Sequence, residues 1–411
     1  MRRRLLSSVD SKIKPNLGGR IHSLDGIRGI AALVVLVHHS ALLFPSLAAT
    51  YYDKTPAETG GTAWWLSHTP LHLLWEGDSA VYIFFILSGV VLTLPFVEKP
   101  FRAKVFFPQR LLRLYLPIWA AVLFAAITVF LVPRTGDTGN AWLDARVENV
   151  TALVLSLDLT LVLGPGGVAT PLWSLQWEIL FSLALPIYLW LAIKWQGHLA
   201  AKLGISILII CSSAFIDGTP GSVLKYLPMF MMGVVMITER DSLTGWAIAI
   251  SRRKGYWPAV FSLGALLLAA RWYVVPLTTS EYLQNLTIGL MVFGAGMIVF
   301  CAVYWPPLTS KLERPIAQWL GRISFSLYLI HEPILVTLAY IMGPANRPWA
   351  AAAGFAISLL AAPLFFRWVE RPSHNLAKAV SARSGRIRGR RDTQRDNAAR
   401  SYTELDLSDG A

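Results

Sequence analysis

The sequence is short of charged residues and of cysteine, and each shortage excludes a class of protein. Only 15% of its 411 residues are charged, whereas an ordinary soluble domain contains about a quarter. The two cysteines, Cys211 and Cys301, lie inside apolar runs, so the sequence predicts neither a disulfide framework nor a cysteine metal site. It also lacks metal-ligand spacings and the Gly-x-Ser-x-Gly element of acyl-serine enzymes. A metal centre and a nucleophilic serine therefore have no support.

Hydrophobic residues, in contrast, make up 55% of the chain. Their repeated long runs predict an all-α fold, a polytopic integral membrane bundle of about ten transmembrane helices. The predicted spans are 28–47, 80–97, 113–132, 172–193, 203–216, 223–238, 257–275, 284–304, 322–342 and 349–369. One further run, 150–163, is short, contains Asp158 and ends in a glycine-rich turn.

The positive charges decide the predicted topology. If 150–163 does not span, every basic stretch falls on the side of the basic N-terminus, as the positive-inside rule requires. We therefore predict that both termini are cytoplasmic. The chain then divides into a basic leader (1–22), a membrane domain (23–372) and a disordered Arg-rich tail (373–411). No nucleic-acid-binding module accompanies the net charge of +13, so membrane lipid, and not nucleic acid, is the predicted partner.

Arg28 and His39 form the most informative pair in the first span. Eleven residues bring them back to nearly the same face of a helix, roughly 16 Å apart along its axis. With Arg28 at the cytoplasmic edge, His39 is expected near the middle of the bilayer. An ionisable group at that depth is costly and usually faces a bundle interior or a water-filled cavity. The pair therefore predicts chemistry that is reached from both sides.

Two long external loops are predicted, at 48–79 and 133–171. The first places carboxylates beside tyrosines and tryptophans, a combination that suits the faces and hydroxyls of sugars. The same tryptophans also fit an interfacial aromatic belt. The sequence leaves both interpretations open.

Several motifs in a fixed order carry a resemblance to one family. They are Leu24-Asp25-Gly26-Ile27-Arg28 with His39, Phe84 to Gly89, Arg110 to Pro117, Trp173-Ser174-Leu175 with Glu178 and Phe181, Gly321 to His331, and Glu370-Arg371-Pro372. Together they resemble acyltransferase family 3, the integral-membrane O-acyltransferases of surface polysaccharides and related acceptors. The chain departs from the family pattern at Ser182, where tyrosine is frequent, and at Ile179, where an acidic residue is frequent.

The resemblance implies an enzyme of the acyltransferase class in the cell (inner or plasma) membrane. The implied donor is cytoplasmic acyl-CoA, usually acetyl-CoA. The implied acceptor is a hydroxyl of a carbohydrate or glycolipid on the far side of the membrane, and no metal is expected.

The resemblance also implies catalytic residues. His39 is expected to act as general base, because a neutral imidazole takes a hydroxyl proton near neutral pH, with Arg28 at the cytoplasmic mouth. Glu178 is expected to bind acceptor hydroxyls, orient a base or relay protons. The alternative for Glu178 is a structural ion pair, with Arg271 as the suggested partner. His38 points about 100° away from His39 and is read as a packing or hydrogen-bonded residue.

Donor binding is assigned to Arg110 and Arg113, one turn apart on one helical face, with His331 and Ser324 as further lining groups. The alternatives are topology anchors for the arginines, an interhelical hydrogen bond for His331 and close helix packing for Ser324. The residues expected to contact the acceptor are Trp173, Ser174 and Asp25.

These assignments predict one polar passage through the membrane. Glu178 is expected about two turns inside the external end of its span, so that an acceptor passes Glu178 before it reaches His39. Arg28 and either Arg110 or Arg113 would then line the inner end of the passage.

Two other classes of function compete with this interpretation. Ten spans with buried His and Glu also suit a transporter or flippase of a lipid-linked glycan, although no paired Gly/Pro-broken helices appear in corresponding halves. A membrane scaffold would leave the buried ionisable groups unexplained.

Overall fold

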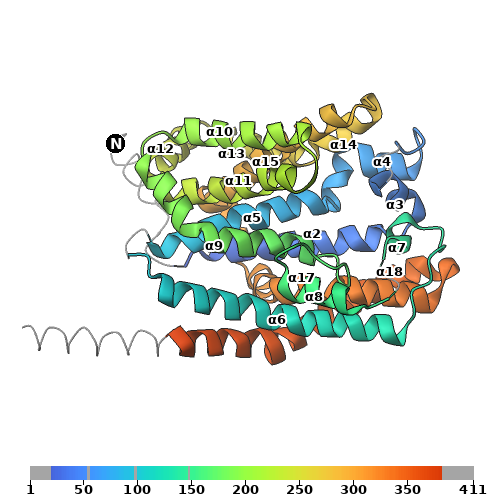
Figure 1. Cartoon of the computed structure of the whole chain (residues 1–411). Helices are drawn as coiled ribbons and strands as arrows, with labels where there is room; N and C mark the ends of the chain where they lie inside the picture. Colours follow the sequence, from blue (N-terminus) through green and yellow to red (C-terminus); the bar gives the residue numbers. More distant parts are fainter. Residues whose placement is uncertain (1–19, 53–55, 97–99, 147–148, 382–411) are drawn as a thin grey trace, which may run out of the picture.

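The computed structural model describes residues 20–52, 56–96, 100–146 and 149–381, and no β-strand occurs among them. Helices follow one another along almost the whole of this described chain (Figure 1). The predicted all-α fold is therefore confirmed.

Within the described ranges, eight helical segments are long and apolar enough to cross a membrane. They are α2 (His22–Ala41), α5 (Gly77–Thr93) with the 3-10 turn η2 (Leu94–Phe96), α6 (Ala103–Leu131), α9 (Leu172–Lys194), α11 (Gly218–Thr238), α15 (Glu281–Tyr304), α17 (Pro315–Met342), and α18 (Arg347–Phe365) between the 3-10 turn η5 (Pro344–Asn346) and the π turn η6 (Phe366–Glu370).

Two of the predicted spans have a different form. Helix α13 (Tyr256–Leu268) continues after a 64° bend as α14 (Ala270–Val274) and the 3-10 turn η4 (Val275–Leu277). The bent pair is either one broken span or a re-entrant loop that does not cross the membrane. Ser79 Oγ donates a 2.6 Å hydrogen bond to the carbonyl of Leu268, at this bend. The bend therefore has a polar partner from α5.

Helix α10 (Leu199–Ser212) has only 14 residues before the 3-10 turn η3 (Ser213–Phe215), about 21 Å of helix against a core of about 30 Å. About ten spans were predicted, and the described part of the chain has eight helices of sufficient length, or nine if the bent pair is counted as one span. The run 150–163, predicted not to span, contains the nine-residue helix α8 (Ala152–Thr160).

The bundle has two distinct ends (Figure 1). The first, which we call the loop end, is where α2 finishes, and it carries α3 (Pro45–Tyr52), α4 (Thr62–His68), the 3-10 helix η1 (Pro70–Leu74), α7 (Ala141–Asp144) and α14. The other, the terminal end, is where α2 begins, and it carries α12 (Arg240–Ser251) and α16 (Pro306–Leu312). Residues 20 and 381 lie at this same end, as an even number of crossings requires.

The helix that contains α18 and η6 runs on without a break to Ser381. His374 on this extension accepts a hydrogen bond from Arg113 at 3.0 Å, and Ala377 is 1% exposed. The predicted start of a disordered tail at residue 373 is therefore wrong for 373–381, because this stretch packs against α6. Residues 382–411 of the predicted tail lie outside the described residues, as do residues 1–19 of the predicted leader.

Helices α2 and α17 approach each other so closely that their backbones touch. A Cβ on Gly29 would lie 2.4 Å from the backbone nitrogen of Gly321, and a Cβ on Gly321 would lie 2.2 Å from the carbonyl oxygen of Asp25. Small residues permit this approach between membrane helices. The contact fixes the register of α2 on α17, and so decides which polar residues of the two helices meet.

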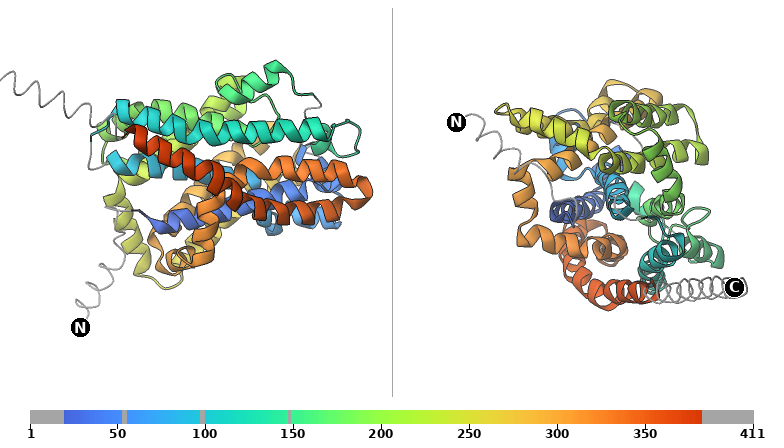
Figure 2. Two further views of the ribbon diagram at one scale, coloured as in Figure 1. Left: turned by 90° about the horizontal axis from the view of Figure 1, so that it is seen from below. Right: turned by 90° about the vertical axis from the view of Figure 1, so that its left-hand side faces the viewer.

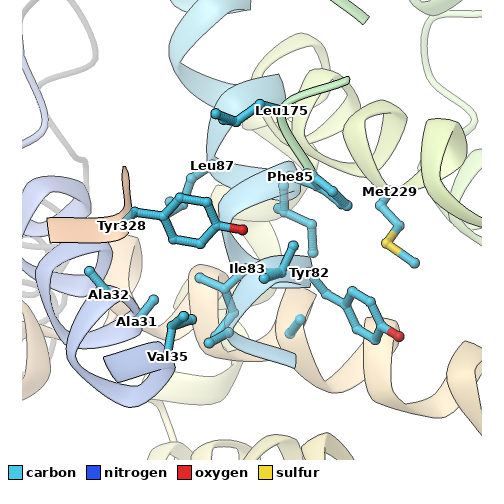
Figure 3. Close-up of a cluster of buried hydrophobic side chains, with 14 of the residues drawn as sticks. Ala31, Ala32, Val35, Tyr82, Ile83, Phe85, Leu87, Leu175, Met229 and Tyr328 are labelled. Atoms are coloured by element: carbon cyan, nitrogen blue, oxygen red, sulfur yellow. The ribbon is translucent and has the colours of Figure 1, made fainter. Parts of the chain in front are cut away.

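The core lies where α2, α5 and α17 converge. Ala31, Ala32 and Val35 of α2 face Ile83 of α5 and the ring of Tyr328 (Figure 3). In the end-on view of Figure 2, α2 and α5 lie near the centre of the bundle. Helices α10 to α15 cover one side of them, and α6, α17 and α18 cover the other.

Candidate active site

Polar side chains gather in two places inside the bundle. The first, which we call the histidine cluster, lies towards the loop end and consists of His38, His39, Tyr52, Trp142, Arg146, Thr170, His331 and Glu332. The second, the arginine cluster, lies towards the terminal end and consists of Arg28, Ser88, Arg110, Arg113, Glu178, Ser182, Ser326, Glu370 and His374.

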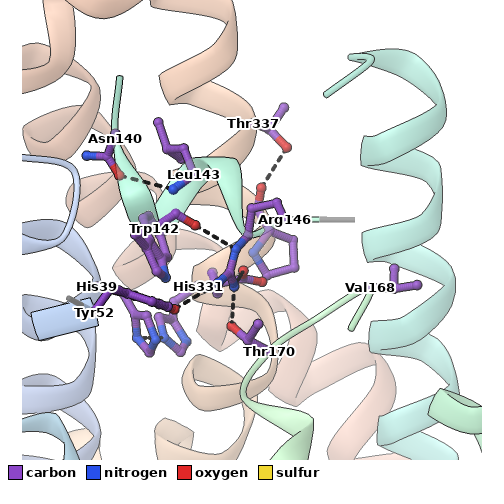
Figure 4. A network of polar contacts seen from close by, with 12 residues as sticks. His39, Tyr52, Asn140, Trp142, Leu143, Arg146, Val168, Thr170, His331 and Thr337 are labelled. Carbon is purple, nitrogen blue, oxygen red and sulfur yellow. Dashed lines mark hydrogen bonds and ion pairs between the residues drawn. The ribbon is translucent and has the colours of Figure 1, made fainter. Parts of the chain in front are cut away.

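Two histidines from different helices meet at the centre of the histidine cluster (Figure 4). Nδ1 of His39 on α2 lies 2.9 Å from Nε2 of His331 on α17. The second ring nitrogen of His331, Nδ1, lies 2.9 Å from the carbonyl oxygen of Leu327, and Nδ1 of His39 lies 3.1 Å from that of Val35. His331 is buried and His39 is half-buried. Among the described residues, Nε2 of His39 has no hydrogen-bond partner.

His39 lies in the last turn of α2, but it meets His331, which is well inside the 28-residue helix α17. The expectation that His39 lies near the middle of the bilayer stays a prediction. The apolar run that defined the span began at residue 28 and ended at 47, whereas the helix begins at His22 and stops at Ala41. Because the first turn of α2 contains polar residues, hydropathy does not indicate that the helix begins at His22. His39 is therefore close to the end of its own helix and to Trp142 of the loop that follows α6.

A loop residue, Arg146, lies over the histidine pair and makes four hydrogen bonds. Its guanidinium donates to Glu332 at 3.0 Å, to Thr170 at 2.9 Å, to the hydroxyl of Tyr52 at 2.9 Å and to the carbonyl of Trp142 at 2.9 Å (Figure 4). The side chain of Arg146 is 2% exposed and that of Glu332 is 0% exposed. A buried charge pair survives only when its remaining hydrogen-bonding capacity is largely satisfied, and four donated bonds achieve this for the arginine.

The short helix α7 is tied directly to the end of α2. Asn140 caps α7 by accepting from the backbone N–H of Leu143 at 3.0 Å, and its amide nitrogen donates to the carbonyls of Leu42 and Leu43. This holds the ring of Trp142 5.6 Å from that of His39, measured between centroids. The loop that follows α6 thus closes the histidine cluster.

His38 has a different environment from His39. Its Nδ1 lies 2.9 Å from the carbonyl oxygen of Trp75, and the two rings stack with centroids 5.6 Å apart. The side chain is buried. This agrees with the interpretation of His38 as a hydrogen-bonded packing residue.

In the arginine cluster, Glu178 pairs with Arg110. The two side chains are 2.5 Å apart, Ser88 donates to the same carboxylate oxygen at 3.0 Å, and Arg110 also donates to Ser182 at 3.1 Å. The suggestion from the sequence that Glu178 pairs with Arg271 is therefore wrong.

The predicted order of Glu178 and His39 along the bundle is wrong. The carbonyl of Pro171, just before α9, accepts a 3.1 Å hydrogen bond from the hydroxyl of Tyr328, which lies one turn from His331 on the side of the terminal end. Helix α9 therefore begins inside the bundle and not at its loop end. Glu178 lies further along it, and so lies on the terminal side of His39.

The remaining arginines of this cluster have few carboxylate partners. Arg113 donates to His374 at 3.0 Å, and Ser326 holds Glu370 with a 2.6 Å bond. Arg28 is within electrostatic range of Asp25, Glu178, Glu370 and Arg110. Among the described residues, neither Arg28 nor Arg113 forms an ion pair with a carboxylate. The cluster thus has an excess of positive charge.

Other residues singled out from the sequence lie elsewhere or have partners of their own. Ser174 bonds the hydroxyl of Tyr328 at 2.6 Å, between the two clusters. Trp173 packs on Tyr226, with ring centroids 5.2 Å apart, and belongs to neither cluster. Ser324 donates back to the carbonyl of Gly321, and Asp25 is bound by Arg20 at 2.7 Å.

Carboxylates and aromatics of the first loop region mainly contact one another. Tyr51 donates to Asp78 at 2.9 Å, and His72 lies 2.7 Å from Glu76. Asp53 lies outside the described residues. A sugar-facing role for this region stays a prediction.

Arg146 and Glu332 were missed by the sequence reasoning. Glu332 directly follows His331 inside an apolar run, and a carboxylate there requires a cationic partner. That requirement was a usable signal. The sequence offered no way to choose Arg146, because it lies in a long loop 186 positions away.

Comparison with known proteins gives one family. The profile of acyltransferase family 3, described as "Acyltransferase domain", matches residues 21–367. Acyltransferase MdmB of Streptomyces mycarofaciens is 27% identical over 382 residues, covering 87% of this chain and 92% of that protein. Peptidoglycan O-acetyltransferase OatA of Listeria monocytogenes is 24% identical over 390 residues, covering 86% of this chain but only 55% of that protein.

O-acetyltransferase PaAT-1 of Phomopsis amygdali is 24% identical over 385 residues, covering 78% of this chain and 73% of that protein. No solved structure matches the chain. The family profile covers most of the chain. It includes the whole histidine cluster and the arginine cluster except Glu370 and His374. The chain therefore belongs to acyltransferase family 3 and is a multi-pass membrane enzyme that transfers acyl groups.

Proposed function

We propose that this enzyme moves an acyl group, most simply acetyl, from acyl-CoA to a hydroxyl of a carbohydrate-type acceptor. The observation that carries the proposal is the division of the polar interior into a cationic cluster and a histidine cluster along one pair of helices. Helix α2 contributes Arg28 to the first and His39 to the second. A polyanionic donor and a hydroxyl acceptor need these two kinds of site.

Donor binding is assigned to the arginine cluster at the terminal end, which we place on the cytoplasmic side. Phosphate groups form strong charge-assisted hydrogen bonds with guanidinium groups. Arg28 and Arg113 have no carboxylate ion pair among the described residues, and Glu178 orients Arg110 through a 2.5 Å contact. About 16 Å of helix separates Arg28 from His39, a gap that suits the long pantetheine arm of CoA.

Transfer is assigned to the histidine cluster. Nε2 of His39 takes the proton of the acceptor hydroxyl as the oxygen attacks the thioester carbonyl. The carbon–sulfur bond then breaks, the acyl group stays on the acceptor oxygen, and the proton returns from His39 to the departing CoA sulfur. The loops that carry Trp142 and Arg146 lie at this end, where we place the acceptor.

A carbohydrate acceptor is supported by the name of one relative, the peptidoglycan O-acetyltransferase. It is also supported by the aromatic residues and carboxylates at the loop end. We place the enzyme in the cell membrane, with the acceptor on its extracytoplasmic face.

The test is acyl transfer by the purified full-length protein in proteoliposomes. Acetyl-CoA labelled in the acetyl group is supplied outside vesicles of known orientation, with peptidoglycan fragments or other glycans as acceptors. Label on the glycan, absent with His39→Ala, is the expected result. Movement of a lipid-linked glycan without any acetylation would overturn the proposal in favour of a flippase.

A further inference from the structure

The contacts of the histidine pair determine which nitrogen carries each proton. A neutral imidazole has one N–H donor and one bare nitrogen acceptor. Carbonyl oxygens only accept, and one of them lies 2.9 Å from Nδ1 of His331. His331 therefore carries its proton on Nδ1, and its Nε2 is an acceptor.

The direction of the interhistidine bond follows from this assignment. Since Nε2 of His331 is bare, the hydrogen between the rings belongs to Nδ1 of His39, 2.9 Å away. The carbonyl of Val35, 3.1 Å from that same Nδ1, also requires a donor there. The opposite arrangement would bring two bare nitrogens against two carbonyl oxygens. Both backbone contacts thus select the same tautomers.

We propose that His331 is a positioning residue that holds His39 as the Nδ1–H tautomer and so keeps its Nε2 bare as the base nitrogen. The inference rests on the proposed function, in which His39 is the general base. It replaces the donor-lining role expected for His331 from the sequence, because both ring nitrogens of His331 have partners inside the protein.

The neighbouring charges fit a neutral partner for His39. A carboxylate commonly orients a catalytic histidine, but here Glu332 is bound to Arg146 at 3.0 Å. The charged and titratable groups that face the pair are His38 on α2, Arg146 after α7 and Glu332 on α17. When Nε2 of His39 takes the hydroxyl proton, the Nδ1–H bond to His331 strengthens because its donor becomes cationic.

Two substitutions separate positioning from simple packing. In His331→Gln, the side-chain carbonyl oxygen can accept at about the place of Nε2, whereas His331→Leu offers no acceptor. We expect His331→Leu to lower kcat by about 100-fold, within the range of a general base, with donor Kd unchanged by calorimetry. His331→Gln should retain kcat within about 10-fold of wild type. Equal losses in both, or none in His331→Leu, would overturn the assignment.

A second readout does not depend on activity. Nitrogen-15 NMR of histidine-labelled full-length protein in nanodiscs distinguishes a protonated from a bare ring nitrogen. The signals of His39 are identified by their loss in His39→Gln, and His38→Gln is the matched control, in which the signals of His39 are still present. A protonated Nδ1 and a bare Nε2 on His39 are expected.

A protonated Nε2 on His39 would overturn the assignment, whatever the enzyme transfers. If wild-type protein fails to transfer acetyl groups while the NMR result is as expected, the proposed function fails and the tautomer assignment survives.

Discussion

The two polar clusters differ in how tightly they are closed. In the ion pair of the histidine cluster, the side chain of Arg146 is 2% exposed and that of Glu332 is 0% exposed. In the ion pair of the arginine cluster, the side chain of Arg110 is 11% exposed and that of Glu178 is 19% exposed. A sealed network holds catalytic groups in one geometry. A partly open site with excess positive charge is suited to a charged ligand that binds and leaves. The difference fits the proposed roles, in which the histidine cluster holds the catalytic groups in one geometry and the arginine cluster binds and releases the charged donor.

The largest effect is expected from the base itself. His39→Ala should lower acyl transfer by about 10² to 10⁴-fold, because it removes the only base nitrogen assigned to the reaction. Membrane insertion should be unchanged, since the substitution exposes no charge. His38→Ala, measured in the same assay and at the same expression level, should keep substantial activity. Equal losses in the two variants would remove the distinction between His39 and His38.

The next effect concerns stability and sharpens the contrast between the two ion pairs. Glu332→Gln should destabilise the protein by about 3–5 kcal/mol, because it leaves Arg146 as an uncompensated buried charge. Glu178→Gln should cost less, about 1.5–3 kcal/mol, since this pair is partly open to solvent and the amide of glutamine can still accept a hydrogen bond. Thermal unfolding in detergent measures both.

The double variant Arg146→Met with Glu332→Leu is the control for this comparison. It removes both charges and should recover much of the stability lost in Glu332→Gln. Similar melting temperatures for Glu332→Gln and Glu178→Gln would contradict the difference in closure between the clusters.

A smaller effect is expected on donor affinity. Glu178→Gln removes the charge that orients Arg110, so the Kd for acetyl-CoA should rise by about 5- to 10-fold, the loss of one charge-assisted hydrogen bond. Calorimetry measures this directly. The exposed Glu313 at the terminal end provides the matched control, Glu313→Gln, which should leave Kd unchanged. An unchanged Kd in Glu178→Gln would show that this carboxylate does not contribute to donor binding.

The smallest effect is expected from shortening the chain. Truncation after Ser381 should leave activity near wild type, because it removes no described contact. Truncation after Pro372 removes His374, the hydrogen-bond partner of Arg113, and should raise donor Kd by a few-fold. Identical Kd values for the two truncated proteins would show that this contact does not order Arg113.

The arginine cluster was the more predictable of the two. Arg28, Arg110, Arg113 and Glu178 all stand in motifs near the ends of long apolar runs, where charge and periodicity carry information. Their gathering at one end was foreseen, except that Glu178 was placed on the wrong side of His39. The cause was the start of α9 inside the bundle, which hydropathy does not reveal.

The histidine cluster was only half predictable. His39 and His331 were found from helical spacing and motif, but their direct contact depends on the register of α2 on α17. That register is set by close backbone contact at Gly29 and Gly321, a packing detail with no periodic signature. Arg146 comes from a loop, where no sequence pattern fixes the position of a side chain.

The central claim is that donor binding and acyl transfer reside in different clusters. It is tested most directly by measuring acetyl-CoA affinity and transfer rate on the same preparations of His39→Ala and Arg113→Ala. We predict that His39→Ala binds acetyl-CoA with wild-type Kd and does not transfer the acetyl group. Arg113→Ala should bind about 10-fold more weakly and reach near wild-type kcat at saturating donor. Loss of donor binding in His39→Ala, or unchanged donor binding with lost turnover in Arg113→Ala, would contradict the division of roles.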